Sequence, residues 1–220
     1  HRRESGIFLA LIALMALIGI FEPNFASASN LYVVSRQIAL TAIVALGVFF
    51  VILTSGIDLS VGSTVGLSGF ICGLSMAAGA HPIVAVVIGL LVGATVGAVN
   101  GVIVAFIGVT PFIVTLGMLG VARGVVMVIK HGDSVREIPQ SFITVGNGSF
   151  LGISVPVIIL ILVAVISHVI LNHTVFGRRV YAIGGNEEAT ELSGINTRKV
   201  KFLTYVICGV MASITGALYV

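Results

Sequence analysis

The chain has 220 residues, of which 58% are hydrophobic and 9% are charged, and its formal net charge is +3. An ordinary soluble domain is about 25% charged, so these residues cannot supply the polar surface that a water-soluble fold of this size needs. The composition excludes a soluble enzyme, a nucleic-acid-binding protein and a disordered chain. It predicts an all-α polytopic membrane protein that contacts membrane lipid.

Seven apolar stretches are long enough to cross a bilayer at about 1.5 Å per residue. In chain order they cover residues 6–21, 38–55, 61–79, 82–107, 111–129, 153–171, and a last stretch that begins near 202 and continues to 220. Residues 56–60 separate the second stretch from the third. An alternative interpretation makes 38–79 a single crossing with a re-entrant half.

The basic residues distinguish these interpretations and predict the orientation of the chain. If every stretch crosses once, the loops on the N-terminal side hold Arg2, Arg3, Arg178, Arg179, Arg198, Lys199 and Lys201, and the opposite loops hold Arg36, Lys130 and Arg136. Basic residues concentrate in cytoplasmic loops. We therefore expect two crossings over 38–79, a cytoplasmic N-terminus, a cytoplasmic loop at 172–201 and an extracytoplasmic loop at 130–152.

A few polar residues lie at membrane depth. A carboxylate at the bilayer centre costs about 2.5–3.5 kcal/mol, so Asp58 is expected to cap the helix that follows the break or to contact substrate at a broken helix. These two roles are compatible. Arg123 must pair with a structural partner, for which Asp58 is one candidate, or contact substrate. Asn100 and Thr115 are expected to join helices by hydrogen bonds.

Glycines recur at helical spacing in three places. The clearest set has a period of four residues, and the others are similar: Gly89, Gly93, Gly97 and Gly101; Gly62, Gly66, Gly69 and Gly73; and Gly117, Gly120 and Gly124. Each set makes a flat stripe that lets helix backbones approach closely. Close packing is the favoured interpretation, and pore lining is the alternative.

The sequence contains no P-loop motif and no His or Cys spacing typical of a metal site. We therefore expect no cofactor and no metal in this chain. Cys72 and Cys208 lie inside apolar stretches and are expected to act as small apolar residues.

The segment 172–201 carries the clearest local signals outside the apolar stretches. Asn186 is a favourable N-cap, Glu187 and Glu188 suit a first helical turn, and Gly194 suits a helix end. The pattern predicts a helix over 187–193. A helix this short is not stable alone in water, so we expect it to dock against the protein's own helices or against a partner. A solvated loop is the alternative.

Three separated motifs resemble, in the same order, those of the permease subunits of ribose-type sugar ABC importers. They read TSGIDLSVGS at 54–63, TPFIVTLG at 110–117 followed by Arg123 and Gly124, and FGR at 176–178 leading into YAIGGNE at 181–187. The letters SGIN at 193–196 then close the loop. Members of this family commonly have glycine where Ser55 stands, and a small residue is kept here.

The resemblance implies one transmembrane permease domain over 1–220 that holds about seven of the family's roughly ten spanning helices and is incomplete at its C-terminus. It implies import of a ribose-like monosaccharide, or of a related polyol or autoinducer, across the bacterial inner membrane. It implies no enzymatic activity, because ATP and Mg²⁺ would bind to separate ABC ATPase subunits. The other implied partners are a periplasmic sugar-binding protein and a second permease subunit, identical or different.

The resemblance also implies roles for particular residues. The segment 172–201 would be a cytoplasmic coupling loop that docks into the ATPase through Gly185, Asn186, Glu187, Glu188, Ala189, Leu192, Gly194 and Ile195. The substrate pathway would be bordered or supported by Asp58, Ser60, Asn100, Thr115 and Arg123. The alternative is an ion- or proton-coupled secondary transporter of a small polar solute, with Asp58 and Arg123 as coupling residues.

Overall fold

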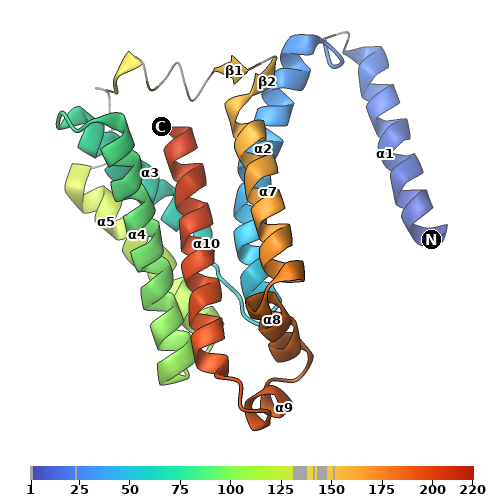
Figure 1. The fold of residues 1–220 in the computed structure, drawn as a ribbon. Coiled ribbons are helices and arrows are strands. Elements are labelled where there is room, and N and C mark those ends of the chain that lie inside the picture. The colour runs from blue at the N-terminus through green and yellow to red at the C-terminus, as the bar shows by residue number, and fades with distance from the viewer. Residues whose placement is uncertain (1, 23, 131–137, 141, 143–147, 151) are drawn as a thin grey trace. The chain divides into compact units, whose positions relative to one another are not determined.

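The computed structural model describes residues 2–22, 24–130, 138–140, 142, 148–150 and 152–220 (Figure 1). The expected loop at 130–152 therefore lies largely outside the described residues. The chain divides into two compact units, His1–Ile38 and Ala39–Val220. The first unit holds helix α1, Arg2–Phe21, and the start of α2. The second unit holds the remaining helices and both candidate sites.

Helix α2 covers Ala28–Ile52 and begins well before residue 38, where the apolar stretch was expected to start. The hydroxyl of Ser27 accepts a hydrogen bond from the Asn30 amide at 3.2 Å, which is an N-cap contact. Polar residues between 28 and 37 lower the local hydropathy without interrupting the helix, so hydropathy alone marked its start too late. The helix ends before Ser55, and residues 56–60 form the expected break.

Three further helices follow the break, close to the expected bounds. They are α3 (Val61–Ala77), α4 (Pro82–Val102), which continues into a π-helical turn η1 (Ile103–Ile107), and α5 (Pro111–Lys130). A proline begins α4 and α5, where its fixed φ suits the first helical turn and its missing N–H is not needed. Gly79 and Gly108, with φ of 90° and 84°, follow α3 and η1.

The last part of the chain begins with a two-stranded antiparallel pair, β1 (Ser149–Phe150) and β2 (Ile153–Ser154). Four helices follow: α7 (Val155–His173), α8 (Val175–Gly185), α9 (Glu187–Leu192) and α10 (Thr197–Tyr219). The last apolar stretch was placed too late at its start, because the first turn of α10 is basic and capped by the Asn196 side chain. The short helix predicted at 187–193 is confirmed.

Helix α8 was not predicted from the sequence. Its N-cap is Thr174, whose hydroxyl accepts a hydrogen bond from the Gly177 amide at 3.2 Å. A Cβ at Gly177 would collide with the carbonyl oxygen of Leu171, so glycine permits the tight turn from α7 into α8. Gly177, Val180 and Ile183 form the buried face of this amphipathic helix. The glycines and the arginine pair obscured the helical pattern.

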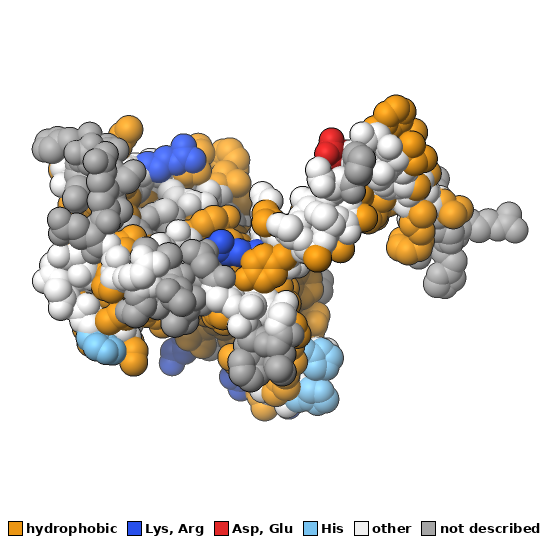
Figure 2. All heavy atoms as spheres, turned by 90° about the horizontal axis from the view of Figure 1, so that it is seen from above, with side chains coloured by type: hydrophobic (Ala, Val, Ile, Leu, Met, Phe, Trp, Pro, Cys, Tyr) orange, Lys and Arg blue, Asp and Glu red, His pale blue; other side chains and the backbone are white. Residues whose placement is uncertain are grey.

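Five described helices are long and apolar enough to span a membrane, namely α2, α4 with η1, α5, α7 and α10. The segments Gly6–Phe21 and Val61–Ala77 are apolar helices of shorter length. All seven expected apolar stretches are therefore helical. Large hydrophobic side chains are exposed along these helices, among them Leu91, Val165 and Leu203, as a surface solvated by a bilayer requires. Figure 2, which looks down on the ends of the helices, shows hydrophobic side chains among uncharged and basic ones. The chain is an all-α polytopic membrane protein.

The core of the second unit is centred on α10. Side chains of α2, α7, α8 and α10 share one buried apolar cluster, in which Ile43, Phe50 and Val180 are fully buried. On its other side α10 packs against α4 and α3, and these three helices lie side by side in Figure 1. α10 is therefore enclosed on several sides.

The glycine stripe of α4 is a close-packing surface, as predicted. A Cβ at Gly93 would collide with the Gly209 carbonyl, and a Cβ at Gly97 with the Tyr205 carbonyl, both in α10. Gly89 faces α3 less tightly, since an added Cβ would lie 3.1 Å from the Cys72 Cβ. The backbones of α4 and α10 are thus in direct contact.

The other stripes pack closely at Gly69 of α3, where an added Cβ would lie 2.6 Å from the Gly216 carbonyl oxygen of α10. At Gly62 and Gly66 of α3, and at Gly117, Gly120 and Gly124 of α5, an added Cβ would have no described atom within 4 Å. Close packing at these five positions was therefore predicted wrongly for the described part of the chain. Spacing gives a stripe, but the rotation of the helix in the fold decides whether that stripe meets a neighbour.

Replacing Gly97 by alanine is expected to lower the free energy of unfolding by about 1–3 kcal/mol, because the new methyl group meets α10 backbone that cannot yield locally. Gly117→Ala is the matched control. It adds the same methyl group in open space, where losing a mid-helix glycine is neutral or favourable. Thermal unfolding of the detergent-solubilised protein measures both. Equal melting temperatures for the two variants would contradict the packing argument.

Candidate functional site

The first candidate site is the break between α2 and α3. Oδ1 of Asp58 accepts hydrogen bonds from the Ser60 amide at 2.9 Å and from the Ser60 hydroxyl at 2.6 Å. The Ser60 Oγ in turn accepts a hydrogen bond from Nδ2 of Asn100 in α4 at 2.9 Å. All three residues are buried, and Ser60 and Asn100 are fully so. The break therefore presents a connected polar network inside an apolar protein.

The capping interpretation of Asp58 holds in part, because its contact lies at the entry to α3 and not within the first turn. The N-cap of α3 is Ser60, and Asp58 binds the amide of Ser60 itself, one position before the helix begins. The Ser60 carbonyl accepts hydrogen bonds from the Thr64 amide, at 2.8 Å, and from the hydroxyls of Ser63 and Thr64. Asp58 thus orders the non-helical residues that lead into α3.

Helix α10 brings a side chain to the break that sequence reasoning missed. The Tyr205 hydroxyl donates to the carbonyl oxygen of Ile57 at 3.3 Å, and Cys208, one turn further along α10, is fully buried in the apolar cluster that Tyr205 shares with Val51. A Cβ at Gly56 would lie 2.8 Å from the Tyr205 hydroxyl, so glycine lets the break approach α10. A tyrosine inside an apolar helix was the available signal.

Asn100 retains an unused polar atom. Its Oδ1 is buried and has no hydrogen-bond partner among the described residues. Because an unpaired buried acceptor is costly, Asn100 is a good position for a hydrogen bond formed only in another state of the protein or with a bound molecule.

Thr115 and Arg123 do not join this network. The Thr115 hydroxyl donates to the Pro111 carbonyl within α5 at 2.8 Å. Arg123 is exposed on α5, and the described part of the chain contains no ion pair between it and Asp58. The five expected pathway residues therefore divide into a connected group of three and two separate residues.

Ser55, just before the break, has a φ of 58°. Among the described residues, it is the only one other than glycine with a positive φ. This left-handed conformation costs most residues roughly 1–2 kcal/mol. Glycine adopts it without strain.

Ser55→Gly is therefore expected to raise the free energy of unfolding by about 1 kcal/mol, after the greater freedom of glycine in the unfolded chain is allowed for. The comparison variant is Ser55→Ala, which keeps a Cβ and hence the strain. Denaturation in detergent under identical conditions measures both variants. A destabilised Ser55→Gly would show that the Ser55 side chain matters more than its backbone conformation.

The second candidate site is α9, which lies after α8 in the segment between the span-length helices α7 and α10. Oδ1 of Asn186 accepts a hydrogen bond from the Ala189 amide at 2.9 Å, and Gly194 ends the helix with φ of 81°. These are the cap and the stop that the sequence predicted. Leu192 is 85% exposed, although the helix is polar and short. A single exposed leucine is common on protein surfaces, so a docking role is indicated by the short capped helix itself, which needs packing to be stable.

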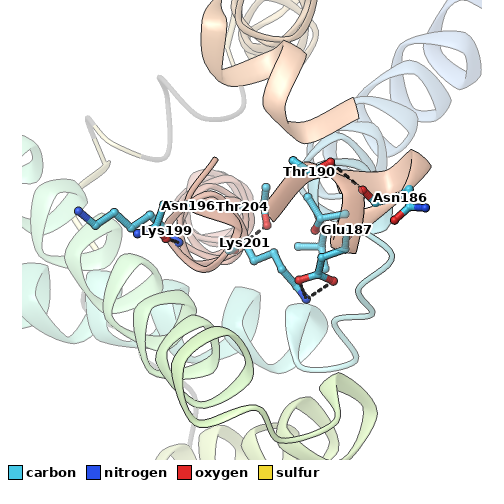
Figure 3. Close-up of polar contacts among 9 residues, drawn as sticks. Asn186, Glu187, Thr190, Asn196, Lys199, Lys201 and Thr204 are labelled. Carbon is cyan, nitrogen blue, oxygen red and sulfur yellow. Dashed lines mark hydrogen bonds and ion pairs between the residues drawn. The ribbon is translucent and has the colours of Figure 1, made fainter. Parts of the chain in front are cut away.

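An ion pair fastens α9 to α10 (Figure 3). Nζ of Lys201 lies 2.9 Å from both carboxylate oxygens of Glu187. A polar hollow lies beside the turn between the two helices, lined by Glu191, Gly194, Ile195, Asn196, Thr197 and Arg198. The site thus combines a capped helix, an exposed leucine and a hollow on one loop. Gly185 of the expected set ends α8, directly before the cap.

The fold and these two sites define a multi-pass helical membrane protein of the transporter class, with a broken helix in its core and a short helix between spans. The sequence profile of the family described as "Branched-chain amino acid transport system / permease component" matches residues 30–220. The chain belongs to this permease family.

Individual relatives cover almost the whole chain. The ribose import permease protein RbsC of Bacillus subtilis (strain 168) is 40% identical over 218 residues, which is 98% of this chain and 68% of the relative. RbsC of Escherichia coli (strain K12) is 42% identical over 221 residues, or 99% and 69%. The D-allose transport system permease protein AlsC of Escherichia coli (strain K12) is 37% identical over 215 residues, or 97% and 66%. No solved structure matches.

Proposed function

We propose that this chain is the membrane-spanning permease subunit of an ATP-driven importer that carries a sugar, of the ribose-like monosaccharide type, across the bacterial inner membrane. The observation that carries the proposal is α9: a capped helix of 6 residues between two span-length helices, with an exposed leucine and an ion pair to α10. A helix this short needs packing to be stable, and its exposed face suits a partner.

The partners follow from this assignment. Two ABC ATPase subunits, which bind ATP and Mg²⁺, would receive the loop 172–201 on the cytoplasmic side, together with the N-terminus. A periplasmic sugar-binding protein would deliver the substrate on the opposite side, and a second permease subunit would complete the pathway. The permease itself performs no chemistry on the sugar.

The pathway would use the break between α2 and α3. Asp58, Ser60 and Asn100 are buried, connected and polar, and one acceptor of Asn100 is unpaired among the described residues. Thr115 and Arg123 on α5 would border the pathway in the assembled permease. The names of the relatives, which include ribose and D-allose permeases, support a monosaccharide as the substrate.

Uptake by the reconstituted complex tests the proposal. The full-length permease, its ATPase and its binding protein are placed in vesicles, and entry of labelled ribose, allose and arabinose is followed. We expect ATP-dependent, vanadate-sensitive uptake of at least one of these sugars. Uptake driven by an ion gradient without ATP would instead establish the ion- or proton-coupled alternative. A stimulated ATPase with no sugar uptake would overturn the substrate assignment alone.

A further inference from the structure

One face of α10 contacts both candidate sites. Lys201, Tyr205 and Cys208 are spaced by four and three residues, which places them on the same side of a helix. Their contacts are Glu187 of α9 at one end and the Ile57 carbonyl at the other, where Cys208 packs in the same buried cluster as Tyr205. At a rise of about 1.5 Å per residue, roughly 10 Å of continuous helix separates the two ends.

The two ends of this face differ in their surroundings. Tyr205 and Cys208 are fully buried, whereas the Lys201 and Glu187 side chains are 19% and 44% exposed. An ion pair this exposed contributes little to stability. Its geometry is nevertheless specific, because Nζ of Lys201 lies at the same distance, 2.9 Å, from both carboxylate oxygens of Glu187.

Between these ends α10 has little freedom to deform. Its backbone contacts α4 at two places, where the Tyr205 carbonyl lies against Gly97 and where Gly209 lies against Gly93. An added methyl group would not fit at any of these glycines. The break has no such support, since residues 56–60 lack regular secondary structure and rely on Asp58, Ser60 and the contacts from α10. A displacement of α9 would therefore move α10 as a unit and change the conformation of the break.

We propose that the Lys201, Tyr205 and Cys208 face of α10 transmits the position of α9 to the break at 56–60, with Lys201 and Glu187 as the positioning pair. This inference rests on the proposed function, in which α9 receives the movement of an ATPase. It adds the residues through which that movement reaches the polar network at Asp58. Rigid elements that join two sites in this way can couple them.

The test uses the full complex of permease, ATPase and binding protein. Hydrogen–deuterium exchange of the peptide that covers 56–60 is compared without nucleotide and with ATP and vanadate, and sugar uptake per ATP hydrolysed is measured in parallel. In Lys201→Met we expect normal assembly with the ATPase, loss of the nucleotide-dependent exchange change, and a fall of about fivefold or more in uptake per ATP. Glu187→Gln, which removes the other partner of the pair, is expected to lose the same exchange change and the same uptake per ATP.

Matched variants isolate the interaction. The charge swap that combines Glu187→Lys with Lys201→Glu is expected to restore both readouts. Lys199→Met removes a neighbouring lysine whose side chain points away from Glu187 (Figure 3) and forms no hydrogen bond or ion pair with α9 among the described residues, and it is expected to behave like the wild type. Tyr205→Phe, which removes only the hydroxyl at the far end, is expected to uncouple the protein as Lys201→Met does, with no further loss in the double variant.

Three results would overturn the inference: an unchanged exchange response and uptake per ATP in Lys201→Met, additive losses in the double variant, or failure of Lys201→Met to assemble with the ATPase. The last would make the pair part of the docking surface. Failure of the proposed function looks different, because the wild-type permease itself would then show no ATPase binding and no ATP-dependent uptake.

Discussion

Asp58→Ala is expected to abolish uptake and to lower the free energy of unfolding by about 2–4 kcal/mol. The substitution removes the acceptor of the Ser60 amide and of the Ser60 hydroxyl, both at a buried position. Buried donors left without an acceptor cost about 1–3 kcal/mol each, although part of this is recovered by local rearrangement. Uptake in vesicles and thermal unfolding in detergent measure the two effects.

Asp58→Asn separates the shape of the side chain from its charge. It keeps an oxygen acceptor in the same place, so most of the stability is expected to return. Uptake by this variant then shows whether hydrogen bonding at the break is sufficient or the negative charge is needed. A stable Asp58→Ala protein with normal uptake would contradict both the structural role and the pathway role of Asp58.

Gly194→Val is expected to abolish ATP-driven uptake while leaving the membrane-spanning helices folded. Gly194 ends α9 with φ of 81°, and a β-branched residue in this region is strained by more than the roughly 1–2 kcal/mol of an ordinary residue. Relief of that strain would change the turn between α9 and α10, and with it the exposed surface that we propose contacts the ATPase. ATPase stimulation and uptake are the measurements.

Gly194→Asn is the matched variant, because asparagine tolerates the left-handed conformation better than other non-glycine residues. It is expected to retain a substantial part of the uptake that Gly194→Val loses. Glu188→Lys reverses a charge on the same helix without straining the backbone, and it is also expected to weaken stimulation. If Gly194→Val transports normally with a fully stimulated ATPase, α9 has no coupling role.

Local signals explain why much of this protein is readable from its sequence. Each apolar stretch became a helix because a chain in lipid must satisfy its backbone hydrogen bonds internally. The cap at Asn186, the stop at Gly194 and the prolines that begin α4 and α5 act within one or two turns. Errors arose where polar residues continued a helix, as at the starts of α2 and α10, and where glycines obscured α8.

The polar network at the break depends on contacts between distant segments. Asp58 was recognisable as an isolated carboxylate, but the side chains that reach the break, those of Asn100 and Tyr205, come from two other helices. Helices that are apolar on every side have no strong pattern to show which side faces inward. The sequence therefore could not distinguish Asn100, which joins Asp58 through Ser60, from Arg123, which does not.

The sequence by itself determined the class of the protein, the approximate positions of its spans and the short helix at 187–193, because hydropathy and capping act over a few residues. Only the tertiary structure decided which glycine stripe meets a neighbour, which polar residues surround Asp58, and that one face of α10 contacts both the break and α9. The physical reason is that these features depend on the rotation and register of packed helices, which are settled by contacts between segments far apart in the chain.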